Sequence, residues 1–92
     1  MGPYQIIVLP EAEEDLAALD PSIRHRCLAK LAWLAAHPER LGQKPLRHLP
    51  PALHGLQSER VGDWRLLYWL YPPHHLLKVY GVRHRSQVYK HL

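Results

Sequence analysis

The residues best suited to chemistry lie near the end of the chain, where an apolar segment runs into RHRSQVYKH (83–91). Arginine, histidine, tyrosine and lysine gather here, and no acidic residue follows Trp64. Guanidinium groups bind phosphates through several donors, and histidine carries protons near neutral pH. The composition of this segment therefore predicts a site that holds a phosphodiester and moves protons around it.

A second arginine is expected to reach the same site from a neighbouring strand. The segment RVGDWRLLY (60–68) places Arg65 inside a strand that follows a tight turn. Antiparallel pairing with the next strand would bring Arg65 beside Arg83, and two convergent arginines suit a phosphate group in flight. On the residues alone, the alternative is that Arg65 pairs with Asp63 or Glu59 and only supports the sheet.

Other residues give weaker chemical signals. The chain has eight histidines, but no two have the i, i+4 spacing of a helical metal site, so we expect neither metal nor cofactor. Cys27 falls in an apolar helical stripe and is expected in the core rather than as a nucleophile. As the single cysteine, it excludes an intramolecular disulfide and suits a reducing compartment.

Length and charge limit the possible classes of protein. We expect 92 residues to form one domain (1–92). No apolar run approaches ~18 residues and the start lacks a secretory pattern, so we expect a cytoplasmic protein that does not enter a membrane. The net charge is +4, and residues 64–92 hold five Lys/Arg and four His without an acid. This basic half predicts an anionic partner: RNA, DNA or an acidic protein.

The hydrophobic pattern predicts an α+β fold of two layers, with a helical hairpin packed on an antiparallel meander. The expected order is strand 4–9, helix 10–19, helix 21–36, irregular connection 39–52, and strands 53–60, 64–71 and 76–82. Alternation along the last strand predicts that Leu77, Val79, Gly81 and Arg83 share a face.

Both predicted helices carry an apolar stripe. The stripe residues are Ala12, Leu16 and Leu19 in the first helix, and Ile23, Cys27, Leu31 and Leu34 in the second, widened by Leu28 and Ala35. Leu46 and Leu49 are expected to attach the irregular connection to the core.

The motifs "RVGDWRLLY … VRHRSQVY", together with this order of elements, resemble the RelE/ParE superfamily of toxins from bacterial type II toxin–antitoxin pairs. The resemblance covers nearly the whole chain and implies the RelE/ParE-like two-layer fold. It also implies a metal-independent, ribosome-dependent mRNA endonuclease that inhibits translation. The expected partners are a cognate antitoxin, the ribosome and mRNA.

The resemblance implies roles for individual residues. Arg65 and Arg83 are expected to be catalytic, as are Tyr89 of the ending RSQVY (85–89) and His84. On a strand, neighbours point to opposite sides, so His84 and Arg83 need not serve one site. A near-terminal tyrosine can alternatively be an anchor for the tail. Further contacts to RNA phosphates are expected from Arg60, Arg85 and Lys90.

The chain also departs from the RelE-like pattern. Some relatives carry two lysines where this chain has Leu56 and Ser58, so a cationic base or phosphate clamp is missing there, and Arg60 is the candidate replacement. Two alternatives therefore stay open. One is a ParE-like inhibitor of DNA gyrase without nuclease activity, and the other is an inactive relative bound to an antitoxin.

Overall fold

The computed structural model of the chain describes residues 2–42 and 45–90. Its helices and strands are β1 (Gln5–Val8), α1 (Pro10–Ala18), α2 (Pro21–Ala36), β2 (Gln57–Val61), β3 (Trp64–Tyr71) and β4 (Leu76–His84). None of the described helices is long and apolar enough to cross a membrane.

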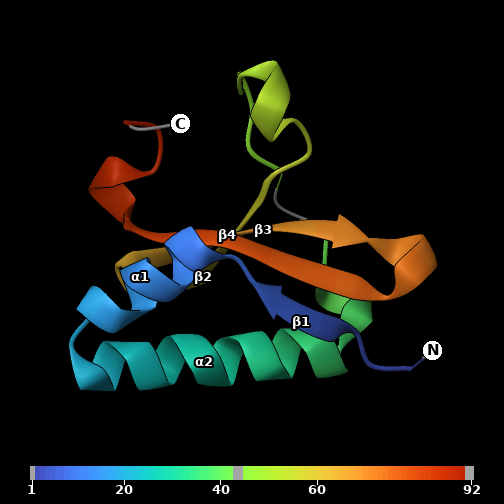
Figure 1. Cartoon of the computed structure of the whole chain (residues 1–92), viewed down its shortest axis with the longest axis horizontal. Coiled ribbons are helices and arrows are strands. Elements are labelled where there is room, and N and C mark those ends of the chain that lie inside the picture. The colour runs from blue at the N-terminus through green and yellow to red at the C-terminus, as the bar shows by residue number, and fades with distance from the viewer. Residues whose placement is uncertain (1, 43–44, 91–92) are drawn as a thin grey trace.

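The strands form one sheet in the order β1-β4-β3-β2 (Figure 1). β2, β3 and β4 make an antiparallel meander, and β1 pairs in parallel with the first half of β4. α2 covers one face of the sheet, which we call the helix face. Residues 45–56 and 85–90 stand over the other, the open face. The predicted two-layer α+β fold is confirmed.

Prolines begin both helices, and one arginine ties the helices together. Pro10 and Pro21 occupy first-turn positions, where an N–H would have no partner within the helix. Arg24 donates from Nε to the Leu16 carbonyl at 2.9 Å and from Nη2 to the Leu19 carbonyl at 3.0 Å. Carbonyls at a helix end lack helical partners, so Arg24 satisfies them and closes the hairpin.

The main core lies on the helix face. Its buried side chains are Ala12, Leu16, Leu19, Cys27, Leu31, Leu34, Val61, Leu66, Tyr68, Leu77, Val79 and Val82. The predicted stripes are confirmed except at Leu28, which is 47% exposed and lines an open cavity beside α1 and Val8. Burial raises the pKa of the Cys27 thiol, in keeping with its predicted place in the core.

A bulge in β4 changes which of its residues share a face. Leu67 pairs with Gly81 and the next residue, Tyr68, pairs with Val79, so Tyr80 is an extra residue in β4. A bulge shifts the alternation of side chains by one position. Positions 77 and 79 therefore face α2, whereas positions 81 and 83 face the open side. The expectation of one common face for these four positions was wrong.

A smaller core lies on the open face. Buried Leu56, Leu67 and Val88 form it, and Leu46 and Leu49 pack against it, as predicted. The strand before the β2–β3 turn starts later than the expected residue 53, because residues 51–53 form a 3-10 turn and residue 55, a glycine, has a φ of 89°. The connection 45–56 is thus fastened over the sheet by its own leucines.

Candidate functional site

Three arginines stand in a row across the open face. Arg60 on β2 pairs in register with Arg65 on β3, which pairs with Arg83 on β4. Residues paired in this way have Cβ atoms about 5 Å apart and point to the same side. The predicted neighbourhood of Arg65 and Arg83 is confirmed, and Arg60 extends it to an arginine row of three. Like charges placed opposite one another are destabilising, so an anion would stabilise the row.

Among the described residues, Arg65 and Arg60 donate hydrogen bonds to backbone oxygens alone. Arg65 Nη1 donates to the carbonyls of Gly62 at 3.3 Å and Trp64 at 3.1 Å. Arg60 Nε donates to the same Gly62 carbonyl at 3.4 Å. Each guanidinium carries five N–H donors, so most donors of both side chains remain for an incoming anion.

The two acids considered as partners of Arg65 contact other bases. Glu59 pairs with Lys30 at 3.8 Å, and Asp63 pairs with Arg85 at 3.7 Å. The second pair is well exposed, so solvent screens it. A purely structural role of Arg65 therefore lacks the ion pairs on which that interpretation depended.

Arg83 has an acidic partner that the sequence did not reveal. Asp15 of α1 accepts hydrogen bonds through Oδ2 from Arg83 Nη1 and, at 2.9 Å, from the backbone N–H of Val82. Arg83 Nη1 also donates to the Val82 carbonyl at 3.1 Å. The acid-free stretch after Trp64 did not reveal this partner, because Asp15 reaches Arg83 only when α1 folds back beside β4.

His84 lies away from the arginine row. Its ring meets Trp64 edge to face at 5.4 Å, and Trp64 packs against the core of the helix face. Its Nδ1 lies 2.9 Å from Ser86 Oγ. The structure therefore brings Arg65 and Arg83 together but leaves His84 on the other side of the strand. No three His, Cys, Asp or Glu side chains within residues 2–42 and 45–90 are grouped to hold a metal.

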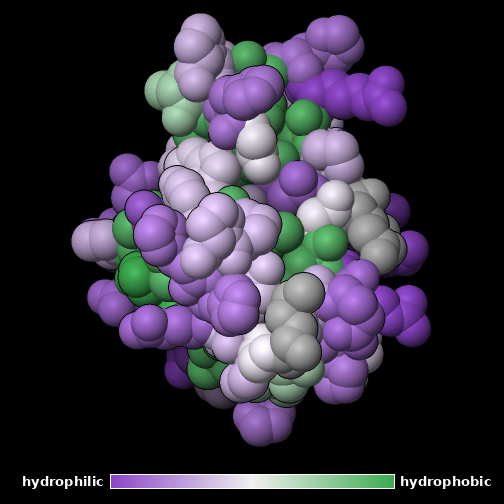
Figure 2. Space-filling model, turned by 90° about the vertical axis from the view of Figure 1, so that its right-hand side faces the viewer, coloured by the Kyte–Doolittle hydropathy of each residue, from purple (hydrophilic) through white to green (hydrophobic). Residues whose placement is uncertain are grey.

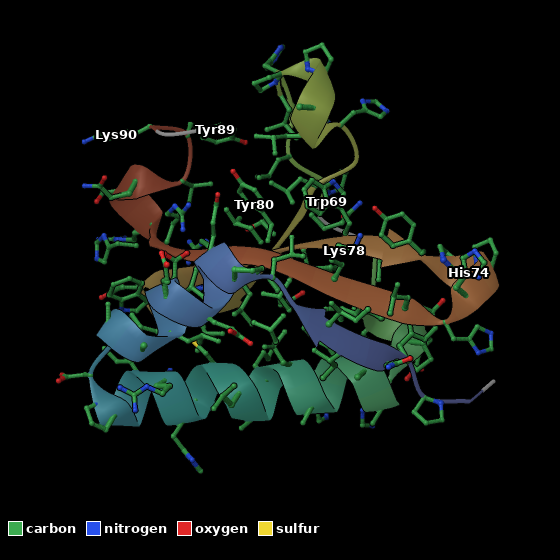
Figure 3. All side chains as sticks on the ribbon, viewed as in Figure 1. Trp69, His74, Lys78, Tyr80, Tyr89 and Lys90 are labelled. Carbon is green, nitrogen blue, oxygen red and sulfur yellow. The ribbon has the colours of Figure 1, made fainter. Side chains whose placement is uncertain are left out.

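The C-terminal segment presents Tyr89 to solvent above the open face (Figure 3). Val88 is buried in the smaller core, and the N–H of Arg85 donates to the Asp63 carbonyl at 2.8 Å. These contacts fix the segment without using the Tyr89 ring, which is 60% exposed. The alternative that Tyr89 anchors the tail is therefore not supported, since Val88 is the anchor. Lys90 is also exposed.

Two residues missed by the sequence reasoning share a cavity with Tyr89. Arg47 and His48 line it together with Pro45, and its volume is about 560 Å³. They belong to the irregular connection, about 40 residues before Tyr89 in the chain, and no local pattern marks them. Arg47 therefore places a cation beside Tyr89, and His48 places there a side chain that can carry protons.

The two positions that depart from the RelE-like pattern have different surroundings. Leu56 is buried in the smaller core, where a lysine would place its charge among apolar side chains. Ser58 pairs with Leu67 and so faces the open side, next along β2 from Arg60. Of the two positions, only Ser58 could have placed a cation near the arginine row.

The other end of the open face is aromatic (Figure 3). Trp69 and Tyr80 meet edge to face at 5.3 Å, and Lys78 Nζ lies 5.0 Å from the centre of the Tyr71 ring. A cavity of about 290 Å³ opens beside Trp69 and Tyr80 toward the start of α1. We call these four residues the aromatic end. The adjoining side of the molecule, at the β3–β4 turn, is mostly hydrophilic, with separate hydrophobic areas (Figure 2).

The model of the family described as the ParE toxin of the type II toxin–antitoxin system parDE matches residues 6–89, which include the arginine row and Tyr89. The chain belongs to the RelE/ParE family of toxins. Toxin RelE of Mycobacterium tuberculosis (strain ATCC 25618 / H37Rv) is 35% identical over 89 residues, which cover 96% of this chain and 88% of that protein. Toxin RelG of the same strain is 34% identical over 90 residues, which cover 96% of this chain and 98% of that protein.

Solved structures agree with this membership in the RelE/ParE family. The toxin–antitoxin complex RelBE2 from M. tuberculosis contains a chain with a TM-score of 0.74 and 35% identity, covering 94% of this toxin and 95% of that chain. This similarity extends over both layers of the fold. The chain is accordingly a toxin of a type II toxin–antitoxin system.

Proposed function

We propose that this toxin is a ribosome-dependent endonuclease that cleaves mRNA by internal attack of a 2′-hydroxyl. The arginine row carries the proposal, because three guanidinium groups on neighbouring strands suit the extra negative charge of a pentavalent phosphorane. The similarity to toxins named RelE supports the same reaction class. In this proposal, the ribosome presents the mRNA in a geometry suited to in-line attack.

In the proposed reaction, a 2′-oxygen forms a bond to the adjacent phosphorus as the bond to the 5′-oxygen breaks. Arg65 and Arg83 bind the non-bridging oxygens, and Arg60 extends the positive field along the RNA. Arg83 stabilises the leaving 5′-oxygen, to which water gives a proton. Tyr89 stacks on a neighbouring nucleotide and relays the 2′-proton, because its hydroxyl oxygen accepts that proton as its own proton passes to water. The products are a 2′,3′-cyclic phosphate and a 5′-hydroxyl.

We further propose that a cognate antitoxin binds this toxin and that its toxin-facing segment is amphipathic and acidic. The related RelBE2 structure is a toxin–antitoxin complex. In this chain, the aromatic end offers the exposed ring of Tyr71 beside Lys78 and the partly buried rings of Trp69 and Tyr80, and the arginine row offers cations. An acidic amphipathic segment would bury the rings and neutralise the arginines.

A substrate with one 2′-deoxy nucleotide at the scissile position tests the proposed reaction. Purified toxin is added to ribosomes programmed with this mRNA or with the all-ribose control, and the RNA ends are sequenced. We expect the control to be cut, leaving a 5′-hydroxyl, and the deoxy substrate to bind without being cut. Efficient cleavage of the deoxy substrate would remove the mechanism.

The second candidate function is inhibition of DNA gyrase without any nuclease activity. Two observations favour it: the matching family model is that of the ParE toxin, and Leu56 and Ser58 stand where some RelE-like nucleases have lysines. A supercoiling assay with purified gyrase separates the two functions. Inhibited supercoiling, together with intact mRNA on the ribosome, would establish this second function in place of the first.

A further inference from the structure

The contact between Asp15 and Arg83 lies at an edge of β4 that β1 does not cover. β1 pairs with residues 76–79 of β4 and goes no further, because its last residue is Val8. Beyond that point α1 lies beside β4 and supplies the missing partner. Asp15 Oδ2 accepts the Val82 N–H at 2.9 Å, as a strand would. The carboxylate is therefore held in place independently of any arginine.

The same carboxylate oxygen holds the guanidinium of Arg83. Within the described residues, the hydrogen bonds of Arg83 all leave from Nη1, to Asp15 and to the Val82 carbonyl. Nε and Nη2 remain for an anion. The side chains are only 19% (Arg83) and 27% (Asp15) exposed, so solvent screens the pair less than a surface ion pair. Arg65 and Arg60 have no such support.

Glycine at position 81 is what allows this contact. A Cβ atom at Gly81 would lie 2.8 Å from Arg83 Nη1 and 2.9 Å from Asp15 Oδ2, closer than real Cβ atoms approach other heavy atoms. Any side chain here would require the carboxylate, the guanidinium or both to move from these positions. Three positions from two distant parts of the chain thus form one unit: Asp15, Gly81 and Arg83.

We infer that Asp15 is a positioning residue that fixes the Arg83 guanidinium for the proposed cleavage, and that Gly81 provides the space for it. The inference rests on the proposed function. An arginine that is already fixed loses less side-chain freedom when it binds the transition state, so the chemical step is faster. The carboxylate also lowers the local positive charge, which weakens the attraction for RNA. Its removal should therefore slow cleavage without weakening RNA binding.

The test is a double-mutant cycle of wild type, Asp15→Asn, Arg83→Ala and the double variant. Asparagine keeps an oxygen that can accept the Val82 N–H, so the fold should be kept. Single-turnover cleavage of ribosome-bound mRNA and toxin binding to the same complexes are measured. We expect Asp15→Asn to cut about tenfold more slowly with unchanged or tighter binding. With alanine at position 83, the change at Asp15 should have no further effect.

Two further variants complete the design. Glu14→Gln removes a neighbouring exposed acid on the same helix and should leave the rate unchanged. Gly81→Ala should slow cleavage as Asp15→Asn does, and the two changes together should slow it no more than one alone. These outcomes would tie the loss of rate to the contact and not to the net charge.

Two results would overturn the inference. One is that Asp15→Asn cuts as fast as wild type or faster. The other is that Asp15→Asn still lowers the cleavage rate when residue 83 is already alanine. If the wild-type chain cuts no mRNA on the ribosome, the proposed function fails and the inference fails with it. If wild type cuts and Asp15→Asn cuts equally well, only the inference fails.

Discussion

The two faces of the sheet are made of alternate residues of the same strands, yet they differ in kind. The helix face forms one continuous apolar core against α1 and α2. The open face has a small core, an arginine row and an aromatic end. Neighbouring residues such as Leu66 and Arg65 therefore belong to different environments. The comparison teaches that the main core and the proposed chemistry occupy alternate positions of β3, such as Leu66 and Arg65, while the open face adds a smaller core of its own.

The largest effect is expected from a matched pair of truncations, Leu66→Ala on the helix face and Leu67→Ala on the open face. Both side chains are fully buried. We expect the free energy of unfolding to fall by about 4 kcal/mol in Leu66→Ala and by about 2–3 kcal/mol in Leu67→Ala. The second value is smaller because the thinner open-face core can collapse into the space left behind. Urea unfolding measures both values. Equal losses would mean that the two cores resist collapse equally.

Removal of an arginine from the row should affect activity and not folding. We expect Arg65→Ala and Arg83→Ala each to slow mRNA cleavage about a hundredfold, a barrier increase of about 3 kcal/mol. Arg40→Ala, at an exposed position away from the open-face core, is the control for charge. Cleavage rates and circular dichroism are recorded together. A collapsed spectrum for Arg65→Ala would show that this arginine is structural.

The aromatic end should contribute to antitoxin binding and not to cleavage. We expect Tyr71→Ala to weaken the affinity for the cognate antitoxin about tenfold, or ~1.4 kcal/mol, because an exposed ring next to Lys78 would be buried in the complex. Trp33→Ala, an equally exposed aromatic position on α2, is the matched control. Titration calorimetry measures both affinities. A larger loss at Trp33 would move the proposed binding surface to the helical side.

The smallest effect at neutral pH is expected for Tyr68→Phe on the helix face. The backbone of Gly42 is close enough to the Tyr68 hydroxyl to lower its pKa slightly, but the two form no hydrogen bond of good geometry, so removal of the hydroxyl should change stability by less than about 1 kcal/mol. Burial raises the pKa of Tyr68 to about 12, above the usual value of about 10 in an unfolded chain.

This difference in pKa decides how the stability of the fold changes at alkaline pH. Between about pH 10 and pH 12 the unfolded chain loses the proton and the folded chain keeps it, so wild-type stability should fall as the pH rises through this window. Tyr68→Phe should lack this part of the decline. Thermal unfolding across the window measures it, and parallel curves for the two proteins would contradict the assignment.

Much of the fold could be predicted from local pattern. The spacing of Ala12, Leu16 and Leu19 marks one helix face, and the turns after Val61 and Tyr71 leave a meander as the simplest path. That Arg65 lies near Arg83 was predictable, because antiparallel pairing across a short turn puts the start of β3 beside the end of β4. Their direct pairing was not, since the register at the turn would pair Arg65 with Val82 and the bulge moves the pairing to Arg83.

The bulge at Tyr80 shows why alternation alone failed within β4. A period of two assigns Leu77 and Arg83 to one face, but one extra residue reverses the assignment for everything that follows. Nothing in the local sequence YGVRH signals the bulge except the glycine. In the structure, Gly81 is needed for the approach of Asp15 and Arg83, which no strand pattern contains.

The sequence by itself determined the elements, their order and the basic C-terminal half, because periodicity, turn chemistry and charge are local properties. Arg65, Arg83 and Tyr89 were selected through the resemblance of their motifs to RelE-like toxins, and their catalytic roles stay predictions. Only the tertiary structure decided that Asp15 meets Arg83 across 68 positions of the chain and that Arg47 and His48 share a cavity with Tyr89. It also placed His84 against Trp64, away from the row. The physical reason is that these contacts arise from the packing of α1 beside β4 and of residues 45–56 over the sheet, and packing joins groups that no spacing along the chain relates.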